Sequence, residues 1–178
     1  MLGLSLVVRA ADVDESGRKG ETPRAYLERI TQAKLDAVVA HLGNRGEDTA
    51  GARVLVADTV VVAPDGGVLG KPRDDADARA MIERLAGATH EVSTRFVLGS
   101  RALVAHAQTV TTRVTFRSVD GDEASAYAAT GEGRDKAGAY AVQGRAAAFI
   151  ERIEGSYTGV VGLPLCEVVV ALRQHGWL

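Results

Sequence analysis

Residues 54–62 read VLVADTVVV. The first four are apolar without a break, which is typical of a strand buried on both faces, and residues 60–62 resume the strand. Between them, Asp58 places a carboxylate directly after apolar strand residues, where it is costly to desolvate unless it meets a metal ion or a cation. Ligands often bind at strand ends in layered α/β proteins. Asp58 is therefore a candidate ligand-binding residue, and the alternative is an aspartate that caps a turn.

A helix is predicted to precede this stretch. Thr22 and Pro23 are suited to be its N-cap and its first residue. Apolar and small residues at helical spacing form its predicted buried face: Tyr26, Ile30, Ala33 and Ala37. Lys34 stands at the edge of that face, so its ammonium group can reach out of a packed helix.

The rest of the chain alternates between strand and helix patterns. We expect, in chain order, a strand over 4–8, a turn over 64–67, a helix over 74–86, three strands between 90 and 116 with breaks at 99–100 and 105–106, a helix over 123–129, a strand over 147–153 and a helix over 164–174. This alternation predicts an α/β or α+β fold, in which helices cover a mixed sheet.

Composition limits the function classes. The chain has 178 residues, of which 46% are hydrophobic, enough for one or two compact domains with a core. Its formal net charge of -2 argues against a nucleic-acid groove, so an anionic ligand must meet a few local cations. No apolar stretch reaches the length of a membrane span, and a cytoplasmic protein is expected by default. The single cysteine, Cys166, lies in an apolar run and is predicted to be a buried structural thiol.

Three further segments could carry chemistry. Lys71 in Leu69-Gly70-Lys71-Pro72 supplies a point charge suited to phosphate, although most such lysines are solvated. Residues 134–144 could present backbone N–H groups and the Gln143 amide to a ligand, or form an ion-paired glycine loop without one. The acidic residues 12, 14 and 15 could hold a divalent cation or be merely solvated. The histidine spacing and the absence of a Gly-x-Ser-x-Gly or Gly-x-x-x-x-Gly-Lys-Ser/Thr motif disfavour zinc hydrolases, serine hydrolases and P-loop enzymes.

Seven short motifs occur together in the order found in Maf proteins, and the chain resembles that family over nearly its whole length. They are Asp12-Val13-Asp14-Glu15, Gly20-Glu21-Thr22-Pro23, Ala57-Asp58-Thr59-Val60-Val61, Leu69-Gly70-Lys71-Pro72, Asp135-Lys136-Ala137-Gly138-Ala139-Tyr140, Val142-Gln143-Gly144, and Gly155-Ser156-Tyr157 followed by Val160-Val161-Gly162-Leu163-Pro164. Each motif is unspecific by itself, but their order is not.

The resemblance implies a single Maf-like domain over 1–178, elongated and two-lobed with a central cleft, related to the house-cleaning inosine-triphosphate pyrophosphatases and often a homodimer. It implies hydrolysis of nucleoside triphosphates to monophosphates and pyrophosphate with Mg²⁺ or Mn²⁺. Asp58 then matches the proton acceptor and, with Glu15, a metal ligand, while Lys34 and Lys71 neutralise phosphate charge. Thr59 and Gln143 match positions associated with base selection, and the subfamily with these residues prefers dTTP and UTP. The alternative subfamily, which acts on 7-methyl-GTP, usually has a different residue after the aspartate.

One family feature is missing from the sequence as given. Maf proteins begin with a strand and a Ser-x-Ser-Pro-Arg-Arg loop that grips the triphosphate, and no Ser-Pro-Arg-Arg occurs here. The expectation is therefore a domain whose N-terminal strand and phosphate loop are missing, and with them the bidentate hydrogen bonds from arginine to phosphate. The alternative to an active pyrophosphatase is a catalytically impaired, nucleotide-binding regulatory protein connected with septum control.

Overall fold

A computed structural model describes residues 6–44, 52–100 and 103–178, and within them the centre of the fold is a five-stranded sheet. The strands are β1 (Val54–Val62), β2 (Val68–Leu69), β3 (Thr89–Gly99), β4 (Val104–Phe116) and β5 (Ile150–Glu154), in the order β2-β1-β3-β4-β5. Each neighbouring pair is antiparallel. The predicted class, helices packed on a sheet, is confirmed.

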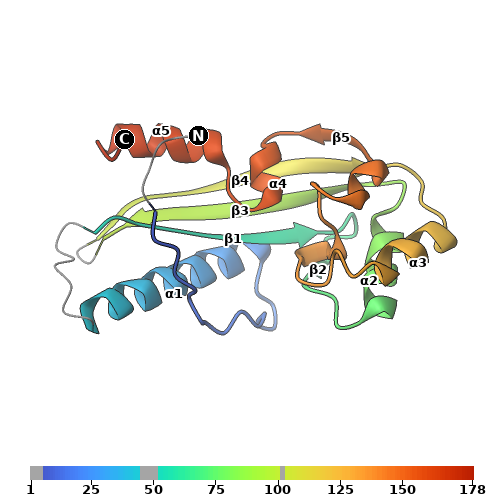
Figure 1. The fold of residues 1–178 in the computed structure, drawn as a ribbon, viewed down its shortest axis with the longest axis horizontal. Helices are drawn as coiled ribbons and strands as arrows, with labels where there is room; N and C mark the ends of the chain where they lie inside the picture. Colours follow the sequence, from blue (N-terminus) through green and yellow to red (C-terminus); the bar gives the residue numbers. More distant parts are fainter. Residues whose placement is uncertain (1–5, 45–51, 101–102) are drawn as a thin grey trace.

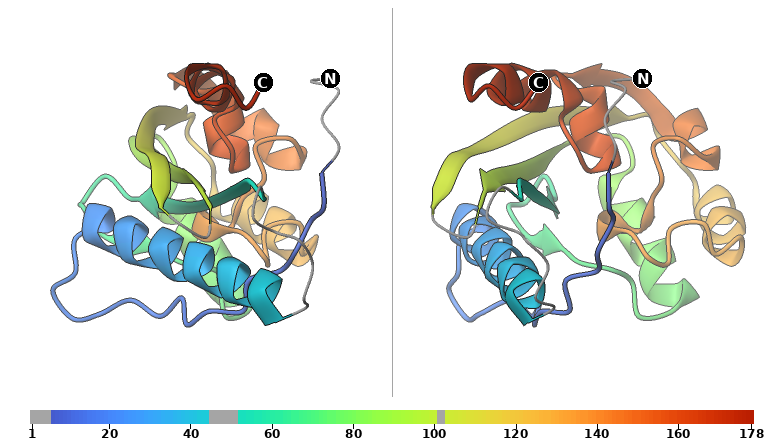
Figure 2. Two further views of the ribbon diagram at one scale, coloured as in Figure 1. Left: turned by 90° about the vertical axis from the view of Figure 1, so that its left-hand side faces the viewer. Right: turned by 60° about the vertical axis from the view of Figure 1, so that its left-hand side comes forward.

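Two helices cover opposite faces of the sheet, as Figures 1 and 2 show. Helix α1 (Pro23–Asn44) packs Leu35 against a cluster that includes Val97 of β3, whereas α5 (Leu165–Gln174) packs against Phe96 and Leu98 on the other side. Successive residues of a strand point to opposite faces, so Val97 and its two neighbours serve different helices. Both faces of β3 are therefore buried at this end.

The other end of the sheet carries the remaining helices and the 3-10 turns (Figure 1). They are α2 (Asp75–Leu85), α3 (Gly121–Ala129), the 3-10 turns η1 (Ala137–Ala139) and η2 (Arg145–Phe149), and α4 (Tyr157–Val161). Asp74 caps α2 by accepting from the Asp77 amide at 2.8 Å, and Ser156 caps α4 by accepting from the Gly159 amide at 3.1 Å. Such caps satisfy amides that a helix start leaves unpaired.

The structure corrects several strand predictions. Leu55 is 38% exposed, so β1 is not buried on both faces. The segment predicted as two strands with a break at 105–106 is one continuous strand, β4. Residues 6–8, the described part of the strand predicted over 4–8, have no regular structure and are exposed, while Leu4 and Ser5 lie outside the described residues.

Helical details also differ from the prediction. The most deeply buried residues of α1 are Leu27, Ile30, Thr31 and Leu35, so only Ile30 of the predicted face is fully buried. Helix α4 was not predicted at all. Cys166 is exposed rather than buried, because the core side of α5 is set by Val168 and Ala171, and Cys166 lies on the other side. Among the described residues, no helix has the length and apolarity needed to cross a membrane.

A buried histidine predicts how stability depends on pH. His90 is 1% exposed, its Nε2 lies 2.9 Å from the Tyr140 hydroxyl, and burial lowers its pKa to about 4. The unfolded chain binds a proton there near pH 6.5 while the folded chain does not, so stability is present above that pH and falls as pH drops toward 4. The loss attributable to His90 is about 3 kcal/mol.

Urea unfolding of the wild type and of His90→Phe, followed from pH 7 to pH 4, measures this contribution. The aromatic replacement keeps a ring beside Phe116 and Tyr140 but cannot be protonated. The variant is expected to lose less stability over that range than the wild type, whatever its starting value. Parallel pH profiles for the two proteins would contradict the assignment.

Candidate active site

A cavity of ≈ 710 Å³ lies beside β1. It is lined by the loop before α1, by α1, by β1, by the chain after β2 and by α4, and it contains five of the six predicted site residues: Glu15, Lys34, Asp58, Thr59 and Lys71. The sixth, Gln143, is exposed and is not among the lining residues. The structure therefore gathers residues from four separate segments and leaves Gln143 outside the cavity.

The charged wall of the cavity is built around Lys34. Its Nζ lies 2.6 Å from Oδ1 of Asp58 and 2.7 Å from Oε1 of Glu15. The other Glu15 oxygen, Oε2, lies 3.6 Å from Nζ of Lys71. Asp58 lies inside β1 and pairs with a helix 24 positions earlier in the chain, so the alternative that it caps a turn is wrong.

Burial makes this cluster chemically unusual. Asp58 and Lys34 have side chains only 11% and 16% exposed. Burial raises the pKa of Asp58, with Glu15 adding to the rise, and together they outweigh the opposing effect of Lys34 and Lys71. Burial also lowers the pKa of Lys34, but its hydrogen bonds to Asp58 and Glu15 outweigh that and raise it. The result is a firmly charged lysine beside a carboxylate more basic than usual.

Glu15 behaves differently from Asp58. The hydrogen bond from Lys34 lowers the pKa of Glu15 and outweighs the opposing effect of burial. Its side chain is 38% exposed, so water solvates its charge more readily than that of Asp58. The two carboxylates on one lysine thus have pKa values pushed in opposite directions, which is a common basis for dividing roles within a site.

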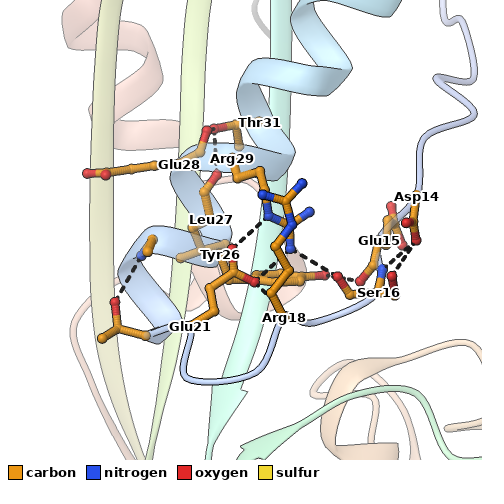
Figure 3. Close-up of polar contacts among 12 residues, drawn as sticks. Asp14, Glu15, Ser16, Arg18, Glu21, Tyr26, Leu27, Glu28, Arg29 and Thr31 are labelled. Atoms are coloured by element: carbon orange, nitrogen blue, oxygen red, sulfur yellow. Dashed lines mark hydrogen bonds and ion pairs between the residues drawn. The ribbon is translucent and has the colours of Figure 1, made fainter.

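The loop that carries Glu15 is tied to α1, as Figure 3 shows. The Tyr26 hydroxyl donates to the Glu15 carbonyl at 3.1 Å, and Arg29 donates to the Ser16 carbonyl at 3.0 Å and to the Glu21 carboxylate at 2.6 Å. The Asp14 carboxylate accepts from the amide and hydroxyl of Ser16. Asp14 therefore shapes the loop, while Glu15 faces Lys34.

The donor set fits a divalent cation only with help from a ligand. Among the described residues, no group of three or more His, Cys, Asp or Glu side chains is placed to hold a metal ion. Glu15 and Asp58 converge on a single cation, the Lys34 ammonium, so both already direct oxygens at a positive charge. Mg²⁺ is commonly held by one or two carboxylates, water and substrate phosphates, and this pair suits that arrangement.

Thr59 lies on the opposite face of β1 from Asp58, because neighbouring strand residues alternate. Val160, Val161 and Gly162 at the end of α4 line the cavity there. Gly162 has φ of 126°, a conformation that favours glycine, and a Cβ on it would lie 3.9 Å from Oγ1 of Thr59. In the described residues β2 pairs with β1 only at Val61 and Val62. The rest of this edge of β1 is open, and the cavity extends around it to both faces of the strand.

Several charged residues within 131–146 already have partners. Glu132 accepts from the Tyr127 hydroxyl and from the Arg145 amide, both at 3.0 Å. Arg134 pairs with Asp75 at 2.8 Å, and Lys136 pairs with its neighbour Asp135 at 3.0 Å. The hypothesis of an ion-paired glycine loop therefore describes Arg134 and Lys136 well, although residues 135, 137 and 140 also line the cavity.

Three structural contributors were missed from the sequence: Tyr26, Glu132 and Thr94. Tyr26 was assigned only to the buried face of its helix, yet its hydroxyl holds the Glu15 loop. Glu132 precedes the segment 134–144 that was considered, and the glycine at 144 is a signal for it, since a Cβ there would collide with the Glu132 carboxylate. Thr94 gives no local signal, because threonines are common throughout β3 and β4.

The chain has relatives among known proteins. A family model described as Maf-like protein matches residues 1–175. Proteins named dTTP/UTP pyrophosphatase are similar to the chain: that of Hahella chejuensis is 46% identical over 179 residues, covering 98% of this chain and 84% of the relative. Those of Geotalea uraniireducens and Geobacter sulfurreducens are each 45% identical, covering 98% and 99% of this chain and 86% and 88% of the relatives.

Proposed function

This chain belongs to the Maf family, and we propose on that premise that it hydrolyses nucleoside triphosphates such as dTTP and UTP to the monophosphate and pyrophosphate. The observation that carries the proposal is the Lys34 ammonium held between Asp58 and Glu15 in the cavity wall. The names of the relatives indicate the class of reaction. Lys34, Asp58 and Glu15 provide the ammonium and carboxylate groups that this reaction needs.

Asp58 is the proposed proton acceptor. Attack of water on the α-phosphorus requires a group that orients the water and takes its proton. Burial raises the pKa of Asp58, which makes its carboxylate a stronger base than an exposed aspartate. Its hydrogen bond from Lys34 keeps it ionised and fixes its orientation.

Lys71 and Lys34 would contact the phosphates of the substrate. Lys71 is 61% exposed and 3.6 Å from Glu15, so it can turn toward a phosphate at little cost. Lys34 is held more firmly and places a permanent positive charge at the cavity wall. Charge that spreads over phosphate oxygens in the transition state is stabilised by such fixed cations.

A divalent ion, Mg²⁺ or Mn²⁺, would be held by Glu15 and Asp58 together with substrate oxygens, and it would neutralise charge on the triphosphate. Thr59, on the other side of the strand edge, would contact the base. Gln143 would reach the base only by movement of its loop, since it lies outside the cavity lining.

The test is release of pyrophosphate from dTTP, UTP, CTP, GTP and 7-methyl-GTP with Mg²⁺ or Mn²⁺. We expect pyrophosphate, with dTTP and UTP as the better substrates, and loss of turnover when the metal is chelated. Release of orthophosphate instead would place the attack at the γ-phosphorus and contradict the proposal. Nucleotide binding without any release would support the regulatory alternative.

A further inference from the structure

Behind Thr59 runs a short chain of hydrogen bonds that ends at α4. Oγ1 of Thr59 lies 2.8 Å from Oγ1 of Thr94, its direct cross-strand partner on β3. Oγ1 of Thr94 donates to the Gly159 carbonyl at 2.7 Å. Thr94 has no exposed surface, whereas Thr59 lines the cavity.

The direction of these bonds is fixed by counting protons. A hydroxyl has one proton to donate, and a carbonyl oxygen can only accept. The proton of Thr94 is committed to Gly159, so in the contact between the two threonines Thr59 must be the donor. Oγ1 of Thr59 then has only lone pairs left for anything that enters the cavity.

The acceptor at the end of the chain is itself held in place. Gly159 is in α4, whose cap residue Ser156 donates its amide to the Thr112 hydroxyl of β4 at 2.9 Å. The Gly159 carbonyl also accepts from the Gly162 amide at 3.0 Å. Helix α4 is thus tied to the sheet at Thr94 and at Thr112, and the Gly159 carbonyl cannot easily turn away.

We propose that Thr94 is a positioning residue that makes Thr59 a hydrogen-bond acceptor toward the cavity, and that this polarity selects pyrimidine bases bearing an N3–H group. Uracil and thymine carry that donor, whereas N3 of cytosine is a lone pair that would face the lone pairs of Thr59. The 5-methyl group plays no part in this contact, so uracil and thymine are treated alike. The inference rests on the proposed function, because it assumes that a nucleoside triphosphate occupies the cavity.

Replacing Thr94 with valine breaks this chain of hydrogen bonds while keeping the branched side-chain shape that suits a strand. In Thr94→Val, the Thr59 hydroxyl is freed to donate to N3 of cytosine. The ratio of kcat/KM for UTP to that for CTP is expected to fall by about tenfold or more, through a gain for CTP as well as a loss for UTP. Thr94→Ser keeps a hydroxyl and should retain the wild-type preference.

Thr112→Val is the matched control. Thr112 is a buried threonine whose hydroxyl also ties α4 to the sheet, through the Ser156 backbone, but it does not touch Thr59. Thr112→Val keeps the hydrogen bonds that the Gly159 carbonyl accepts from Thr94 and from the Gly162 amide, so it should cost stability while leaving the UTP-to-CTP ratio unchanged. Equal losses for UTP and CTP in Thr94→Val would mean that Thr94 only supports α4, and would overturn the inference.

The unaltered protein can be tested with UTP methylated at N3, in which a methyl group replaces the N3–H donor. Binding of UTP, CTP and this probe as α,β-methylene analogues, which resist cleavage at that bond, separates recognition from turnover. We expect the wild type to bind the UTP analogue most tightly. Equal binding of all three would overturn the inference while leaving hydrolysis intact, whereas no pyrophosphate release together with selective binding would contradict only the proposed function.

Discussion

Replacing Asp58 with asparagine is expected to lower kcat for pyrophosphate release by about 10²–10⁴-fold, the usual cost of losing a general base. Asparagine has the same shape and can still accept the hydrogen bond from Lys34, so the cavity wall keeps its geometry. It cannot take a proton from water. Pyrophosphate release at saturating UTP, compared between the two proteins, measures the effect.

The same variant is expected to keep its stability. The raised pKa of Asp58 means that its ionised form is held at a cost in the folded protein, and that cost grows as pH rises through the raised pKa. Removing the charge removes the cost, while Lys34 retains Glu15 as a partner. Asp65→Asn, at an exposed turn aspartate, is the control that should leave kcat unchanged. An Asp58→Asn enzyme with wild-type kcat would exclude Asp58 as the proton acceptor.

The sequence predicts much of the charged cluster. Asp58 stands out because an apolar strand rarely contains an unpartnered carboxylate, and Lys34 stands out because helical spacing puts it at the edge of a buried face. The resemblance to Maf proteins adds Glu15 and Lys71. What local patterns cannot supply is the set of partners, since the bond between Lys34 and Asp58 spans 24 positions.

The errors have a common physical origin. An apolar run predicts a strand buried on both faces, but β1 pairs with antiparallel neighbours, and Leu55 is left partly in water. Ala105 and His106 weaken the local strand pattern, yet pairing with β3 carries β4 through them. Helix α4 spans only residues 157–161, less than two turns, and depends on its cap and on the sheet rather than on periodicity. Each is a case in which tertiary structure overrides local preference.

The hydrogen bond between Thr94 and Thr59 shows a second limit of prediction from sequence. Thr94 is one of several threonines in a pair of strands where that residue is common, and only the register of β1 with β3 places it opposite Thr59. Register depends on the whole sheet, so a single strand cannot reveal it. The proposed contact with the base therefore depends on strand pairing, whereas the proposed contacts with phosphate follow from individual motifs.

Replacing Lys34 with methionine is expected to cost both stability and activity. The variant leaves Asp58 and Glu15 close together without the ammonium that holds them, and an uncompensated charge in a mostly buried pair costs about 3 kcal/mol. Loss of one fixed cation at the proposed phosphate site is expected to lower kcat/KM for UTP by about 10²–10³-fold. Urea unfolding and pyrophosphate release measure the two effects separately.

The stability loss should depend on pH and on Asp58. With Lys34 gone, the pKa of Asp58 is expected to rise further, and a raised folded-state pKa destabilises the protein increasingly as pH rises through it. The deficit of Lys34→Met should therefore shrink between pH 8 and pH 5, and the double variant Lys34→Met/Asp58→Asn should regain part of it, because the orphaned charge is removed. The opposite result is a stability loss that is the same at every pH, with the effects of the two substitutions simply adding in the double variant. It would mean that Lys34 stabilises the protein through packing of its side chain and that the two carboxylates are not coupled through it.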